Sequence, residues 1–147
     1  MDSGIRPKGG IGAYSDGVPS IGAENIFGLG NYDYSSTKYV PSVFYANLRR
    51  GIITDGDVLL YKDGAQIGRK TMFSSDFPFE KCCINEHVFR LRANNKINQT
   101  YLFFWLDQKA VTEKIKNLNA NSAQPGINKE GVYSLEILIL MNIRLLC

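Results

Sequence analysis

The sequence predicts an α+β domain, in which a twisted, mostly antiparallel β-sheet is followed by two C-terminal helices and a closing strand. Short segments with strand-like patterns dominate the chain up to Ala93, and helical periodicity appears only after it. Strands that precede helices, without a regular alternation of the two, are typical of this class. The 147 residues suit a single domain over residues 1–147, and a hydrophobic content of 44% allows a globular core.

The N-terminal third of the chain predicts little regular structure. Residues 6–10 (RPKGG) indicate a loop, because proline fixes φ and glycine accepts conformations that other residues avoid. Residues 18–26 predict a short edge strand or an extended entry segment, with Pro19 near its start. Residues 27–43 are rich in Tyr, Gly, Asn and Ser, which predicts a long surface loop.

The clearest strand signal lies in the middle of the chain. Residues 58–61 (VLLY) predict a strand, and residues 65–73 predict its antiparallel partner. Between them, Asp63 and Gly64 predict a two-residue hairpin turn, because both positions accept positive φ. Residues 83–84 and 87–92 predict further strand, with His87 on the face of Phe89 and Leu91.

Two helices and a last strand are predicted after residue 93. Residues 99–106 (QTYLFFWL) predict a mostly apolar helix, whose aromatic residues suit a core better than a base-stacking surface. Residues 109–118 predict a second helix with Val111, Ile115 and Leu118 on one buried stripe and Lys109, Glu113 and Lys116 opposite. Residues 133–140 predict the closing strand.

Charge and cysteine usage narrow the class of protein. The formal net charge of +3 permits an anionic partner without requiring one. The three cysteines are odd in number and two are adjacent, which indicates a reducing compartment rather than a disulfide framework. No signal peptide or membrane-spanning segment is visible, so we expect a cytoplasmic location and no membrane partner.

No catalytic or metal-binding constellation is apparent. His87 is the only histidine, and we interpret it as a half-buried strand residue rather than a catalytic base. Cys82 and Cys83 are adjacent, so on a strand they point to opposite faces and do not suit a zinc site. A metal-dependent nuclease remains an alternative, and it requires three carboxylates to converge. These are Asp55, Asp57 and Asp63.

Several stretches, in order, resemble the target-recognition domains of type I restriction-modification specificity subunits. They are residues 6–10 (RPKGG), 17–26 (GVPSIGAENI), 53–69 (ITDGDVLLYKDGAQIGR), 84–91 (INEHVFRL), 101–106 (YLFFWL), 122–128 (SAQPGIN) and 135–140 (LEILIL). The resemblance covers residues 4–140. Residues 141–147 depart from the family pattern, which continues into a Pro-rich turn and a long helix, and we interpret them as an atypical or truncated end.

The resemblance implies a division of labour. This chain binds one half of a bipartite double-stranded DNA target and is not an enzyme. Methyltransferase subunits bind S-adenosylmethionine and methylate adenine, and a restriction subunit cuts, so no cofactor or metal is expected here. A homodimer is possible, because the chain has room for only one such domain. The alternative is a protein-interaction half-subunit that docks on a methyltransferase, or on a second copy, without binding DNA alone.

The resemblance also directs attention to residues that suit DNA. Arg and Lys pair with guanine, Gln pairs with adenine, and cations hold phosphates. The predicted contacts in the hairpin are Lys62, Gln66, Arg69 and Lys70. Those outside it are Arg49, Arg50, Tyr34, Lys38, Gln124 and Asn128. The alternative for the cations is a solvated surface charge, and for Gln124 and Asn128 a plain connection between helix and strand. Arg90 and Arg92 share one strand face and could follow the DNA backbone or protect a sheet edge.

Overall fold

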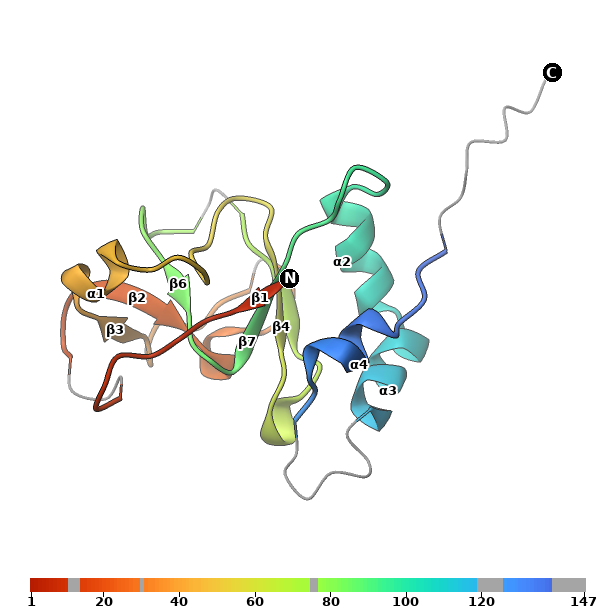
Figure 1. Ribbon diagram of the computed structural model, residues 1–147, viewed down its shortest axis with the longest axis horizontal. Coiled ribbons are helices and arrows are strands. Elements are labelled where there is room, and N and C mark those ends of the chain that lie inside the picture. Colours follow the sequence, from red (N-terminus) through yellow and green to blue (C-terminus); the bar gives the residue numbers. More distant parts are fainter. Residues whose placement is uncertain (11–13, 30, 75–76, 119–125, 139–147) are drawn as a thin grey trace.

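A four-stranded antiparallel sheet forms the centre of the molecule. The computed structural model describes residues 1–10, 14–29, 31–74, 77–118 and 126–138. The strand order is β1 (Asp2–Ser3), β7 (Val88–Leu91), β4 (Val58–Tyr61) and β5 (Lys70–Met72). Figure 1 shows these strands between a strand-rich part on the left and the helices on the right.

A second, three-stranded sheet lies beside the first. Its order is β3 (Lys38–Val40), β2 (Val18–Ile21) and β6 (Cys83–Ile84). The β2–β3 pair is antiparallel, and the β2–β6 pair is parallel. The short helices η1 (Ala23–Asn25) and α1 (Ser42–Ala46) follow β2 and β3.

The helices pack on one side of the central sheet. They are α2 (Gln99–Asp107), α3 (Lys109–Asn117) and α4 (Lys129–Tyr133). The Asn98 side chain accepts a hydrogen bond from the backbone N–H of Tyr101, which satisfies a donor that the first turn of α2 leaves free. Across the described ranges, no helix is long and apolar enough to cross a membrane.

Strand β4 contributes to two separate hydrophobic clusters. Val58 and Leu60 belong to the cluster beneath the helices, which also contains Phe103 of α2 and Ile115 of α3. Leu59 points the other way, into the cluster shared with the second sheet. All three β4 residues are fully buried, and such burial contributes about 1.5–3 kcal/mol per large apolar side chain.

The predicted class and its strongest elements are confirmed. The chain is α+β with mostly antiparallel pairing. The strand over residues 58–61 has the predicted bounds, and both helices begin at the predicted residues, 99 and 109. Val111 and Ile115 of the predicted stripe are buried, whereas Leu118 is 39% exposed because it follows the last helical turn.

The predicted closing strand is wrong where the structure describes it. Tyr133 ends helix α4, and residues 134–138 have no strand partner. Leu135 and Ile137 instead turn their side chains onto the helical cluster, whereas Leu138 is 80% exposed. Residues 139 and 140 of that prediction lie outside the described part of the chain.

Three further expectations need correction. The loop predicted over residues 27–43 contains β3, because Lys38–Val40 pairs with β2. Strand β2 is central in its sheet rather than at an edge, and Pro19 is tolerated because β6 pairs with β2 only from Ser20 onward. The tight two-residue turn is instead a longer connection through the short helix η2 (Gly64–Gln66), so the partner strand begins at Lys70.

Candidate nucleic-acid interface

The connection from β4 to β5 forms a fixed loop rather than a flexible one. The Tyr61 N–H donates to the Arg69 carbonyl at 2.8 Å, and the Gly68 N–H donates to the Tyr61 carbonyl at 3.0 Å. Gly64 and Gly68 have φ of 63° and 86°, which an L side chain would strain. The side chains of this loop are therefore presented from a backbone whose position the sheet determines (Figure 1, the lime coil below β4).

Two of the predicted contact residues meet at this loop. Gln66 is exposed, and Arg69 is partly buried. The Arg69 guanidinium donates from Nη1 to the Ala23 carbonyl at 3.2 Å. Its central carbon lies 5.1 Å from the centre of the Phe27 ring.

A surface hollow of about 300 Å³ separates the η2 loop from helix α3. Gln66 and Arg69 line it from the loop, and Thr112 and Lys116 line it from α3. We call it the loop–helix hollow. Lys116 is about half exposed, and its ammonium lies 3.3 Å from Glu113 of the same helix. Three residues whose side chains end in an amide, a guanidinium and an ammonium therefore line one hollow, and these are groups that base edges and phosphates bind.

Sequence reasoning placed Lys116 on the polar face of its helix but did not link it to the loop. The two lie far apart in the chain, and only the packing of α3 on the sheet brings them together. The hydrogen bond of 2.8 Å from the Lys70 ammonium to Thr112 is part of that packing. No local pattern in the sequence signals it.

Lys70, a predicted DNA contact, points into the protein. Its side chain is 7% exposed, and its ammonium also lies 3.4 Å from Asp107 of α2. Burial lowers the pKa of Lys70, and the nearby Asp107 carboxylate only partly opposes this. The structure therefore gives Lys70 a role in joining β5 to the helices.

Lys62 belongs to a connected series of ion pairs and polar contacts, which we call the charge chain. Its ammonium lies 3.3 Å from Asp63 Oδ2, and the same oxygen lies 2.7 Å from His87 Nδ1. The other ring nitrogen lies 3.4 Å from Glu86, whose carboxylate is 3.1 Å from the Arg6 Nε. Two carboxylates offset the cations here, so Lys62 contributes little uncompensated positive charge.

Other predicted contacts are dispersed. Lys38 forms an ion pair of 2.7 Å with Glu24. Arg49 and Arg50 are exposed just after α1, and within the described residues neither has an ion-pair partner. Asn128 caps α4 by accepting a hydrogen bond of 2.8 Å from the Gly131 N–H. Gln124 lies outside the described residues.

Tyr34 belongs to an aromatic cluster. Its ring stacks on Tyr32 with a centre-to-centre distance of 6.1 Å and an angle of 14°. It also meets the edges of Phe77 and Phe79 at 5.6 and 5.8 Å. Tyr34 is 39% exposed, so one side of this cluster reaches the solvent.

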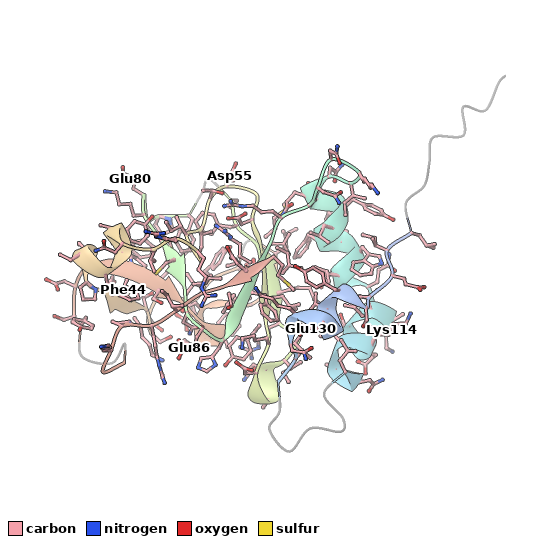
Figure 2. The ribbon with its side chains drawn as sticks, in the orientation of Figure 1. Phe44, Asp55, Glu80, Glu86, Lys114 and Glu130 are labelled. Carbon is pink, nitrogen blue, oxygen red and sulfur yellow. The ribbon has the colours of Figure 1, made fainter. Side chains whose placement is uncertain are left out.

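The nuclease alternative lacks its carboxylate cluster. The Asp57 carboxylate is buried and forms two contacts of 2.5 and 2.8 Å with the Arg92 guanidinium. Asp63 belongs to the charge chain with Glu86, and Figure 2 shows Asp55 and Glu86 on opposite edges of the molecule. Among the described residues, no three histidine, cysteine or acidic side chains are grouped to hold a metal ion.

The two central cysteines are buried. Burial raises the pKa of the Cys83 thiol to about 11 and raises the pKa of the Cys82 thiol well above its usual range. Because the thiolate is the nucleophile and the metal ligand, thiols held in the protonated form suit neither role. Arg90 is largely buried and contacts Asp2 and the Ile52 carbonyl, whereas Arg92 is about half exposed and is paired with Asp57.

Comparison with known proteins identifies a family. Residues 19–139 match the family model described as type I restriction modification DNA specificity domain. No curated protein sequence matches. A solved structure titled "Structural basis underlying complex assembly and conformational transition of the type I R-M system" resembles this fold with a TM-score of 0.57 at 17% identity. The likeness covers 88% of this chain and 28% of that chain. Because the family model matches most of the sequence, the chain belongs to the family of type I restriction-modification DNA specificity domains.

Proposed function

We propose that this domain reads one half of a bipartite double-stranded DNA target, and that it does so at the loop–helix hollow. Membership of the specificity-domain family supports DNA target recognition as the general function. The single observation that supports this surface is the meeting of Gln66, Arg69 and Lys116 around one hollow. These three side chains stand on a rigid loop and a helix, which favours precise presentation to a base edge.

Each of the three side chains has a distinct role in this proposal. Gln66 offers the paired donor and acceptor that match N6 and N7 of adenine, and Arg69 offers the paired donors that match O6 and N7 of guanine. Lys116 offers one strongly hydrated charge, which suits a phosphate and sets position rather than sequence. Arg49 and Arg50 are proposed as further phosphate contacts, since both are exposed.

The chemistry of modification and cleavage is assigned to partner subunits. In this proposal the domain works in the cytoplasm, and methyltransferase subunits bind S-adenosylmethionine and methylate adenine. A restriction subunit cuts the DNA. The proposal gives this chain a binding role and no catalytic step, which agrees with the engagement of Asp57 and Asp63 in ion pairs.

Selection from a random duplex library tests the proposal. The purified chain is incubated with the library at low and at physiological salt, and bound DNA is sequenced. We expect enrichment of a short motif. Arg69→Lys keeps the charge but loses the paired donors, so it is expected to relax preference at one position of the motif, at a cost of about 1–3 kcal/mol. Gln66→Ala is expected to relax a different position.

A matched pair of lysines on α3 provides the control. Lys116 lines the hollow, whereas Lys114, labelled in Figure 2, does not. Lys116→Ala is expected to weaken binding to all sequences alike and to reduce the slope of log affinity against log salt by about 1. Lys114→Ala is expected to leave that slope unchanged. Equal effects of the two variants would contradict the proposed surface, and the absence of any motif for the unaltered chain would contradict sequence reading.

A second candidate function rests on an apolar surface around α2, α4 and the chain that follows α4. Tyr133 and Leu138 are 66% and 80% exposed, and Ile137 and Trp105 line an apolar hollow between α2 and the chain after α4. This favours a half-subunit that docks on a methyltransferase or on a second copy of itself. Sedimentation of the chain, alone and with the methyltransferase, tests it, and a complex that forms without DNA binding would replace the first proposal.

A further inference from the structure

The Arg69 guanidinium is held at two points that the predicted contact set did not include. Nη1 donates to the carbonyl of Ala23 in η1, and the ring of Phe27 lies against the guanidinium. Phe27 is 53% exposed, although a large apolar side chain gains by burial. The exposed Phe27 ring forms a cation–π contact with Arg69, because a guanidinium is attracted to an aromatic face.

The segment that carries these two points is itself fixed. Asn25 is fully buried, and its side chain accepts from the Gly22 N–H at 3.0 Å and donates to the Asp33 carbonyl at 2.9 Å. The Gly28 carbonyl accepts from the Thr71 hydroxyl of β5 at 2.8 Å. Phe27 therefore stands between two anchored residues, and β5 begins directly after Arg69.

The remaining edge of the guanidinium faces accessible space. Arg69 lines the loop–helix hollow on one side and, with Phe27 and Gly28, a second hollow of about 290 Å³ on the other. Within the described residues, neither Nε nor Nη2 has a protein partner. These two groups form one of the paired-donor edges of a guanidinium, and paired donors match O6 and N7 of guanine.

We propose that Phe27, together with the Ala23 carbonyl, positions Arg69 so that its Nε–Nη2 edge reads a single guanine of the target. Phe27 is a positioning residue and touches no base in this proposal. A guanidinium that is already held in place loses less side-chain freedom on binding. The Phe27 ring therefore increases the preference for guanine without adding a charge. The inference rests on the proposed function, because it presupposes that Arg69 meets DNA.

The test compares base preference position by position for four variants. Phe27→Leu removes the ring face and keeps an apolar side chain, and Phe27→Trp keeps a ring face. Phe104→Leu is the matched control, since Phe104 is also 53% exposed but lies on α2. Arg69→Lys identifies which position of the motif Arg69 reads. Duplexes that carry each of the four bases at that position are then titrated against every variant.

We expect Phe27→Leu to lower the preference for guanine at the Arg69 position about two- to five-fold, the size expected of an exposed cation–π contact. Other positions should keep their preferences, Phe27→Trp should restore guanine, and Phe104→Leu should change nothing. An unchanged guanine preference in Phe27→Leu, or a uniform loss at all positions, overturns the positioning role while leaving sequence reading intact. The absence of a motif for the unaltered chain instead overturns the proposed function and this inference together.

A measurement without DNA tests the geometry separately. The Arg69 Nε–Hε signal in a proton–nitrogen correlation spectrum responds to the ring that lies over it. We expect this signal to move in Phe27→Leu and to stay dispersed in Phe27→Trp, while backbone signals of the central sheet remain in place. A signal identical in the unaltered chain and in Phe27→Leu contradicts the contact, and widespread backbone shifts would show that the substitution acts on folding instead.

Discussion

Two neighbouring residues, Arg69 and Lys70, have opposite surroundings. Successive side chains on a strand point to opposite faces, so at the start of β5 one cation reaches the surface and the next enters the interior. Arg69 lines two hollows, whereas Lys70, which borders only the second of them, is 7% exposed and bonded to Thr112. The two positions therefore separate a surface effect on DNA from an effect on stability.

Substitution of Lys70 is expected to alter stability against pH and to leave base preference unchanged. Burial lowers the pKa of Lys70, so between that lowered pKa and the ordinary value of 10.5 the unfolded chain binds more protons than the folded one. The free energy of unfolding gains a term that rises with pH across this alkaline window. In Lys70→Met this rise should vanish, as measured by urea unfolding at a series of pH values.

Selection from the DNA library completes the test of Lys70. Lys70→Met should show the same selected motif as the unaltered chain, whereas Arg69→Lys should not. At neutral pH the variant should be as stable or more stable, because Asp107 is more than half exposed and can be solvated once its partner is gone. A Lys70→Met protein that lost its motif while remaining folded would show that the ammonium reaches DNA after all.

At the scale of elements, Asn128 has a structural duty that competes with its predicted DNA contact. Its side chain caps the five-residue helix α4 through the Gly131 N–H. Asn128→Ala is expected to lower the free energy of unfolding by about 1 kcal/mol, the usual effect of removing such a cap, and to leave the DNA motif unchanged. Asn98→Ala, which removes the corresponding cap of α2, is the matched control for stability.

Thermal unfolding and library selection together separate the two roles of Asn128. A loss of stability similar to that of Asn98→Ala, with an intact motif, supports capping alone. A changed motif without loss of stability would instead favour the predicted contact. The short length of α4 makes the position sensitive, because a helix of five residues has few other bonds to maintain it.

The elements that the sequence predicted well are those encoded by local patterns. Residues 58–61 are a continuous apolar run before a turn, and Val111 and Ile115 repeat at helical spacing. Strand β3 and the parallel pairing of Ser20 with Cys83 have no such signal, because they depend on partners far along the chain. Residues 135–138 alternate like a strand, but Leu135 and Ile137 pack on the helical cluster, and among the described residues no strand pairs with this segment.

The candidate site was predictable in part for the same reason. Gln66 and Arg69 follow a recognisable Asp-Gly turn, so the sequence singles them out. The partners of Lys62, Lys70 and Lys38 are set by tertiary packing, which decides whether a cation is neutralised, buried or free. Phe27 lies in a stretch that reads as surface loop, and its contact with Arg69 joins residues that only the fold brings together.

At the scale of the whole molecule, the net charge of +3 does not show how many cations are free to contact DNA. Several cations are paired within the protein, including Arg92 with Asp57 and Lys38 with Glu24. Counterion release therefore depends on exposed cations that have no ion-pair partner within the described residues, such as Arg49 and Arg50, and on exposed ones such as Lys116 whose surface ion pair is weak. Binding by this chain alone should have a modest salt slope, and under the proposed function tight binding to the target depends on contacts from the partner subunits.

Strand β4 also determines how the molecule loses its structure. Val58 and Leu60 belong to one cluster and Leu59 belongs to the other. Because both clusters share strand β4, unfolding of one cluster removes packing residues from the other. We expect a single cooperative transition, with tryptophan fluorescence from Trp105 and circular dichroism giving coincident urea curves. Amide protons of β4 should exchange only through global opening, and two separated transitions would show that the helical and strand-rich parts are independent foldons.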